Sequence, residues 1–138
     1  MQRRDFLALT AALASIPFSL SAASNRLPYS PGLVASSLAV GETVFLDFKA
    51  SWCTTCRAQE KVISALKSQN PDYEKHIAFI DVDWDFFGRS ELVSQLKIPH
   101  RSSLAVLKDN EELGRIVANT RRRDIKFFLD IALSAAPS

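Results

Sequence analysis

The sequence has few cysteines, little net charge and no hydrophobic run long enough to cross a membrane comfortably. Its 138 residues include two cysteines, and 17 basic residues against 15 acidic ones leave a formal net charge of +2. Apart from Arg121 to Arg123, which fit a solvated helix start, basic residues are dispersed, so nothing supports nucleic-acid binding. A structural zinc site needs four ligands, and only His76 and His100 could join the cysteines, without helical ligand spacing. The composition, 47% apolar and 23% charged, is that of one ordinary domain.

The N-terminal residues have the pattern of a bacterial export signal. Arg3 and Arg4 precede an apolar, alanine-rich stretch that ends in small residues, with a cleavage position near Ala23. The paired arginines resemble the twin-arginine type of signal, which exports folded cargo. The apolar stretch is short for a membrane span of ~20 residues, although an uncleaved anchor is an alternative. We therefore expect residues 1–24 to be a signal peptide, residues 25–138 to be the working domain, and the protein to act in the periplasm.

Both cysteines lie between a segment typical of a buried strand and a segment typical of a helix. Cys53 and Cys56 are three residues apart, so on a helix they share one face at roughly the 5.5 Å Cα separation of a disulfide. The first helical turn favours a thiolate, which makes Cys53 the better nucleophile and Cys56 the residue that resolves a mixed disulfide. A purely structural disulfide would close a four-residue loop and contribute only about 2 kcal/mol. We therefore predict a redox pair with an accessible Cys53 sulfur.

The hydrophobic pattern predicts alternating helices and strands over the rest of the chain. Residues 25–31 are typical of an extended lead-in, and Thr120 is a plausible cap for a final helix. On the helix that follows the cysteines, Glu60 and Lys67 fall on the outward face. The other predicted elements are a helix over 33–40, a strand over 43–50, a helix over 53–68, a strand over 77–82, a helix over 90–96, and a hairpin of strands over 103–108 and 112–118.

The segment from Val44 to Cys56 resembles the active-site strand and motif of the thioredoxin family. It contains the skeleton Asp-Phe-x-Ala-x-Trp-Cys-x-x-Cys, and the order of elements agrees with that family from roughly residue 31 to residue 133. The motif is most similar to exported thioredoxin-like domains, including the C-terminal domain of the periplasmic disulfide reductase. The resemblance implies an α/β thioredoxin fold, with a central mixed sheet of about four strands and helices on both faces. It also implies a thiol-disulfide oxidoreductase that needs no cofactor beyond a redox-active Cys53–Cys56 disulfide.

The resemblance further implies roles for residues around the pair. Asp47 would lie buried beneath the sulfurs as a proton acceptor for Cys56, and burial of a carboxyl group supports this role because it raises the pKa toward neutrality. Trp52 would shield the sulfurs and offer an apolar docking surface. Thr54 and Thr55, also in the substrate-docking region, replace the proline or histidine of other members, and we expect a moderate thiol pKa because hydroxyls bring no charge.

A second departure from the family concerns the loop that faces the disulfide. Family members have a cis-proline there, and counting back from the strand end places Ser102 at this position. Matching Pro99 instead would require the loop to absorb three extra residues. A non-proline cis bond costs about 3 to 4 kcal/mol, so the peptide before Ser102 is expected to be trans or else supported by its surroundings.

Two functions follow from these residues. The first is disulfide exchange with protein substrates, with reduction preferred on the resemblance alone; in an oxidising compartment a reductant needs a membrane or periplasmic electron donor. We expect a monomer and no nucleic-acid partner. The alternative is periplasmic copper binding and delivery by Cys53, Cys56 and His100, because soft thiolates with an imidazole suit copper.

Overall fold

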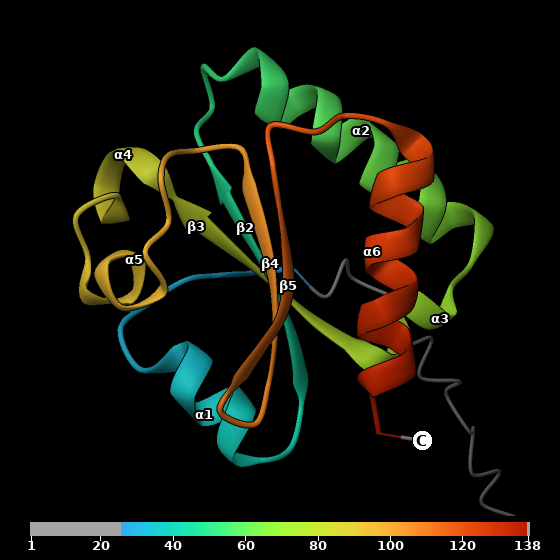
Figure 1. Ribbon diagram of the computed structural model, residues 1–138, viewed down its shortest axis with the longest axis horizontal. Helices are drawn as coiled ribbons and strands as arrows, with labels where there is room; N and C mark the ends of the chain where they lie inside the picture. Colours follow the sequence, from blue (N-terminus) through green and yellow to red (C-terminus); the bar gives the residue numbers. More distant parts are fainter. Residues whose placement is uncertain (1–25, 138) are drawn as a thin grey trace, which may run out of the picture.

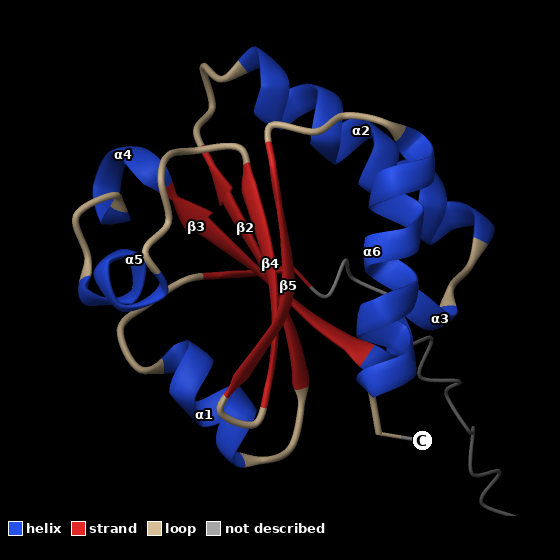
Figure 2. Cartoon of the chain, in the orientation of Figure 1, coloured by secondary structure: helices blue, strands red, loops and turns tan. Residues whose placement is uncertain are grey.

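A mixed sheet of five strands with helices on both faces forms the framework of the protein (Figures 1 and 2). The computed structural model describes residues 26–137. In chain order the elements are β1 (Arg26–Pro28), α1 (Leu33–Ala39), β2 (Thr43–Lys49), α2 (Thr54–Gln69), α3 (Asp72–His76), β3 (Ile77–Asp83), α4 (Trp84–Phe87), α5 (Glu91–Leu96), β4 (Ser103–Lys108), β5 (Glu111–Val117) and α6 (Arg122–Ala135).

The central strand β2 determines the layout of the sheet. The strand order is β1-β3-β2-β4-β5, with β2 parallel to β3 and antiparallel to β4. The strand residues from Val44 to Phe48 are all buried, as expected for a strand that is covered on both faces. The predicted α/β class, with a mixed sheet between helices, is confirmed, and the sheet has one strand more than the predicted four.

Two hydrophobic cores lie on opposite faces of the sheet. On one face, α2, α3 and α6 pack around Phe45 and Leu129. On the other face, α1, α4 and α5 pack around Leu46 and Ile80. Figure 2 shows these two groups of helices on either side of the strands. Because side chains alternate along a strand, Asp47 lies on the same face as Phe45, toward α2.

The additional strand is β1, in the segment predicted to be an extended lead-in. Its residues Arg26, Leu27 and Pro28 pair in parallel with Phe79 to Asp81 of β3. The strand was not predicted because three residues that include a proline show no hydrophobic alternation. It forms because its backbone pairs with β3. The short helices α3 and α4 were also not predicted, because four or five residues are too few to show a helical period.

Two predictions about helix residues need correction, one on the exposure of Lys67 and one on the N-cap of α6. Lys67 was expected to face outward, but its residue is only 8% exposed, and its Nζ lies 3.7 Å from the Phe79 ring centroid and 3.4 Å from Glu74 on α3. The unpredicted helix α3 explains this burial. The N-cap of α6 is Arg121 and not Thr120, and no side-chain hydrogen bond caps it.

The N-terminal prediction lies outside the described residues. The export signal over residues 1–24 and the alternative of an uncleaved anchor both concern residues before this range, so both stay predictions. Within residues 26–137, no helix combines the length and the apolar character that a membrane crossing requires. Three exposed arginines, 121 to 123, open α6, in agreement with the expected solvated helix start.

Candidate functional site

The two cysteines lie at the start of α2, directly after the central strand. Their sulfurs form a disulfide, and the Cα atoms are 5.2 Å apart, close to the predicted separation. Cys53 is the N-cap of α2, and the Cys56 backbone N–H donates a hydrogen bond to the Cys53 Sγ at 3.1 Å. A sulfur at a helix N-terminus is stabilised as a thiolate by this N–H and by the helix dipole. The geometry therefore favours Cys53 as the nucleophile once the disulfide is reduced.

The sulfur-bearing residues are more covered than the sequence suggested. Cys53 is 3% exposed and Cys56 is 2% exposed, and they pack with Ala50 against the partly buried Trp84 of α4. The expectation of an accessible Cys53 is therefore wrong for this disulfide form. The cover comes from α4, which the hydrophobic pattern did not predict, and from the loop before β4.

Ser102 is the residue of that loop that faces the disulfide. Its Oγ lies 3.2 Å from the Cys53 Sγ and 3.3 Å from the Cys56 Sγ, within hydrogen-bonding distance of both. The loop prediction placed Ser102 here, and Pro99 is instead exposed. No peptide bond within residues 26–137 is cis, so the peptide before Ser102 is trans. A hydroxyl group takes the position that the family resemblance assigns to a proline ring.

The backbone of Ser102 is fixed by three hydrogen bonds. Its N–H donates to the Phe48 carbonyl at 2.8 Å, and its carbonyl accepts from the Ala118 N–H at 2.9 Å. The Gln59 side chain of α2 donates to the same carbonyl at 3.1 Å and to the Asn119 carbonyl at 3.2 Å. Ser102 has φ +65°, a left-handed conformation that is uncommon for serine. These contacts hold a strained residue against the sulfurs.

Trp52 forms an exposed platform beside the buried pair. Its residue is 53% exposed, and its Nε1–H donates to both carboxylate oxygens of Asp85, at 2.9 and 3.0 Å. The Arg101 guanidinium stacks on the indole, 4.3 Å from the ring centroid. The indole is thus held on both sides, and it presents apolar surface next to Cys53. Thr54 is exposed and Thr55 is half-buried. Their roles in substrate docking stay predictions.

Asp47 is buried on the α2 side of the sheet, at 2% exposure. Its Oδ2 lies 3.2 Å from Arg26 Nη2, and its Oδ1 has no hydrogen-bond partner among the described residues. Burial raises the pKa of Asp47 from 3.8 to about 7, and repulsion from Asp81 adds to the rise, whereas Lys49 and Arg26 oppose it. Such a carboxyl group can bind and release a proton near neutral pH. The proposed transfer from Cys56 stays a prediction.

Arg26 holds a cluster of charges around Asp47. Its Nη2 lies 2.7 Å from an Asp81 oxygen, and its Nη1 lies 2.8 Å from a Glu60 oxygen. Lys49 Nζ completes the cluster, at 2.9 Å from the other Glu60 oxygen and 3.8 Å from Asp81.

Sequence reasoning missed this cluster. Arg26 was placed in a lead-in and Glu60 on an outward face, but Glu60 turns toward the sheet and its side chain is only 37% exposed. One signal was available in the strands, because parallel pairing of β2 with β3 sets Asp47 opposite Asp81. Two adjacent carboxyl groups on neighbouring strands favour either a nearby cation or a protonated member of the pair.

His100 does not join the cysteines. It is exposed, and its Nδ1 contacts the Arg101 carbonyl. In the part of the chain with coordinates, no three His, Cys, Asp or Glu side chains are grouped so that they could hold a metal ion. Ser102, two residues further along the loop, occupies the position against the sulfurs. The copper alternative that used Cys53, Cys56 and His100 therefore has no support in this geometry.

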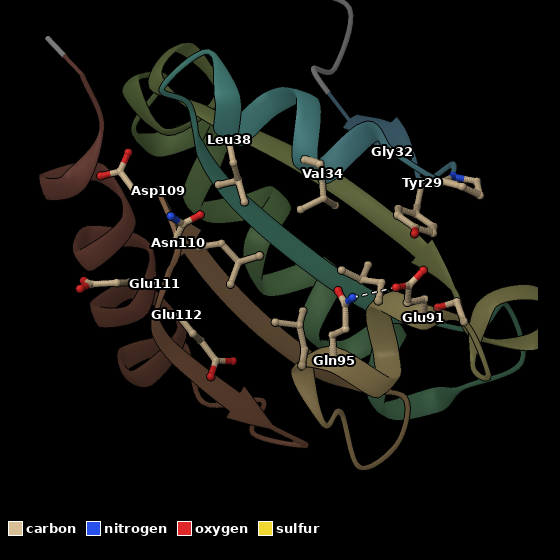
Figure 3. A pocket seen from close by; sticks show the side chains of 16 residues that line it. Tyr29, Gly32, Val34, Leu38, Glu91, Gln95, Asp109, Asn110, Glu111 and Glu112 are labelled. Carbon is tan, nitrogen blue, oxygen red and sulfur yellow. Dashed lines mark hydrogen bonds between the residues drawn. The ribbon is translucent and has the colours of Figure 1, made fainter.

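A separate hollow of about 850 Å³ lies on the α1 side of the sheet. Figure 3 shows it between α1, α5 and the β4–β5 turn, with Val34 and Leu38 on one wall and Glu91 and Gln95 on another. Neither cysteine, Asp47 nor any other predicted site residue lines it. The hollow is therefore separate from the predicted redox site at the start of α2.

Comparisons with known proteins relate most of the chain to one family. The family model described as Thioredoxin matches residues 35–130. A thioredoxin H-type of Fagopyrum esculentum is 34% identical over 77 residues, which are 56% of this chain and 61% of the relative. A thioredoxin of Chlamydia trachomatis serovar D is 36% identical over 84 residues, which are 60% of this chain and 74% of the relative.

The match to the plant relatives covers only part of their length. This chain spans 49% to 61% of the length of three plant thioredoxins that it matches. Among solved structures, Trxlp from Edwardsiella tarda EIB202 superposes with a TM-score of 0.66 at 24% identity, covering 75% of this chain and 97% of that chain. At this identity the likeness shows the fold alone. The matched family region contains Asp47, both cysteines and Ser102.

Proposed function

The chain belongs to the thioredoxin family, and from this we propose that it is a thiol-disulfide oxidoreductase acting on protein substrates through Cys53 and Cys56. The observation that carries the proposal is the Cys53–Cys56 disulfide at the N-terminus of α2, with Cys53 as the N-cap. In the family, such a pair exchanges disulfides without an organic or metal cofactor.

The exchange cycle starts from the reduced pair. The Cys53 thiolate attacks one sulfur of a substrate disulfide, forms a mixed disulfide and releases one substrate thiolate, which takes up a proton. Asp47 in its ionised form accepts the proton of Cys56, directly or through a water, and the Cys56 thiolate attacks the Cys53 sulfur. The second substrate thiolate leaves and is protonated, and the Cys53–Cys56 disulfide reforms. The substrate gains two electrons and the protein loses two.

Ser102 and Trp52 have different roles in this cycle, one at the sulfurs and one at the substrate. The Ser102 hydroxyl lies within 3.3 Å of both sulfurs, so it can donate a hydrogen bond to whichever sulfur carries the negative charge. Trp52, held by Asp85 and Arg101, provides the apolar contact surface for an approaching polypeptide. This arrangement explains how a covered Cys53 is reached, because the partner docks beside it on the indole.

We place the protein in the periplasm, working as a monomeric reductant. The support is the pattern of residues 1–24, with paired arginines before an apolar stretch. In that oxidising compartment, a reductant has to be recharged by a periplasmic or membrane-bound electron donor. Replacement of Arg3 and Arg4 by lysine is the test of location. We expect the precursor to accumulate in the cytoplasm, and unchanged export would contradict the twin-arginine assignment.

Trapping of substrates tests the oxidoreductase activity. In a Cys56→Ser variant, the mixed disulfide at Cys53 has no resolving thiol, so partner proteins should remain covalently attached and be released by dithiothreitol. A Cys53→Ser variant is the matched control and should trap none. The direction of electron flow follows from the reduction potential of the purified protein, for which we expect about −250 mV or below, whereas a value near −120 mV would indicate an oxidant.

A further inference from the structure

Among the described cations, the Arg26 side chain is the one hydrogen-bonded to the buried carboxyl group of the site. It comes from β1, a strand of only three residues at the edge of the sheet. Its Nη2 is shared between Asp47 at 3.2 Å and Asp81 at 2.7 Å, and its Nη1 binds Glu60 at 2.8 Å. The side chain is only 16% exposed, so these interactions are partly shielded from solvent.

The charges around Asp47 come from four elements packed near it. β1 supplies Arg26, β2 supplies Lys49, β3 supplies Asp81, and α2 supplies Glu60. The residue opposite Asp47 on β4 is the uncharged Leu104.

With Asp47 ionised, the cluster has three negative and two positive charges. Removal of the guanidinium leaves one ammonium group for three carboxylates. The Lys49 ammonium also lowers the pKa of Asp47 through its charge, but it hydrogen-bonds to Glu60, whereas the guanidinium contacts Asp47 directly.

We propose that Arg26 is a positioning residue of the exchange reaction: docked through β1, its guanidinium keeps Asp47 available in the ionised form that accepts the Cys56 proton. The planar guanidinium suits this task because its three nitrogens donate to three carboxylates from three different elements at once. The inference rests on the proposed oxidoreductase function. It makes the N-terminal edge strand a part of the redox site, although β1 contributes no residue that touches the sulfurs.

A merely structural role for Arg26 predicts something different. If the guanidinium only fastened β1 to β3 and α2, its loss would lower the free energy of unfolding and leave the ionisation of Asp47 unchanged. The two roles are separated by following the titration of the Asp47 carboxyl group itself. Burial and repulsion from Asp81 raise the pKa of this group, and the charges of Lys49 and Arg26 lower it.

The test compares Arg26→Met with Arg115→Met in the full domain. Arg115 is a matched control because it also binds a carboxylate, Glu112, and two backbone carbonyls, on β5 away from the cluster. The ¹³C shift of the Asp47 carboxyl group reports its ionisation in the oxidised protein. Stopped-flow reduction of a protein disulfide by the reduced protein gives the pH profile of exchange.

In Arg26→Met, we expect the midpoint of the Asp47 titration and the acid limb of the pH–rate profile to shift together to higher pH, by about one unit. At pH values below the limb, the exchange should then be roughly tenfold slower. Arg115→Met should move neither. Arg26→Lys keeps the positive charge but not the planar guanidinium, so its titration midpoint and acid limb should lie between those of wild type and Arg26→Met. This variant also provides the test if Arg26→Met does not fold. In an Asp47→Asn background, Arg26→Met should have no further effect on the acid limb.

An unchanged Asp47 titration in a folded but less stable Arg26→Met protein would overturn the inference and leave Arg26 as a structural anchor. Failure of the wild-type protein to reduce any protein disulfide would instead refute the proposed function. The carboxyl titration still tests the Arg26–Asp47 coupling in that case, so the two failures are distinguishable.

Discussion

A single carboxyl group in the central strand links the chemistry of this protein to its stability. Asp47 is buried in β2, and its pKa is raised from 3.8 to about 7 because burial disfavours the charged form. Between these two values, the folded protein binds more protons than the unfolded chain. The contribution of Asp47 to the free energy of unfolding therefore falls as the pH rises from about 4 to 7.

Replacement of Asp47 by asparagine tests this linkage. At pH 4, where Asp47 is protonated in the fold, the variant should be about as stable as wild type. At pH 8 the variant should be more stable by roughly 4 kcal/mol, because three pKa units of unfavourable ionisation are removed. Urea unfolding of the oxidised proteins between pH 4 and pH 8 gives the comparison. A stability difference that does not change with pH would contradict the raised pKa.

Ser102 provides a second test at the residue scale. Its φ of +65° and its N–H bond to Phe48 are both impossible for proline, which fixes φ near −65° and has no N–H. Ser102→Pro should therefore lower the free energy of unfolding by about 3 kcal/mol, although the family resemblance assigns a proline to this position. Ser102→Ala keeps the backbone bonds and is the control, with a smaller loss. Equal stability of the two variants in urea would show that the loop can adopt another conformation.

At the scale of elements, the long patterns were predictable and the short ones were not. The strand before the cysteines and the helix after them were predicted to within a residue or two, because β-branched and apolar runs and a helical period extend over seven or more residues. Asp47, Cys53 and Cys56 lie on these elements, and Ser102 was found by counting from the next strand. β1, α3 and α4 are too short to show a period. Their consequences, namely the Arg26 cluster, the buried Lys67 and the covered Cys53, were missed with them.

Gln59 joins α2 to the two loops beside the site. Its amide donates to the Ser102 and Asn119 carbonyls, and the residue is fully buried. Gln59→Leu should reduce the free energy of unfolding by about 1–3 kcal/mol, because the partly buried Asn119 carbonyl and the buried Ser102 carbonyl lose a donor. Gln95→Leu is the control, since Gln95 is exposed on α5 and binds only Glu91. Chemical denaturation checks both variants, and equal losses would argue against a special role of Gln59.

For the whole molecule, the disulfide is a small part of what holds the fold together. The disulfide joins residues that are only three positions apart in the sequence, whereas the two cores extend over both faces of the sheet. Reduction by dithiothreitol should therefore lower the free energy of unfolding by about 2 kcal/mol and leave the circular dichroism spectrum unchanged. A Cys53→Ser/Cys56→Ser double variant should match the reduced protein. Loss of the folded spectrum on reduction would contradict this account.

The position of Arg26, three residues after the expected cleavage position near Ala23, has a consequence for maturation under the proposed export. If a signal peptidase cuts there, Arg26 becomes one of the first residues of the mature protein. Miscleavage a few positions downstream would yield a polypeptide with both sulfurs, the buried carboxyl group and nearly the whole sheet, yet without its guanidinium. Under the proposed export and the proposed role of Arg26, the accuracy of one proteolytic cut would then set the pH range of disulfide exchange.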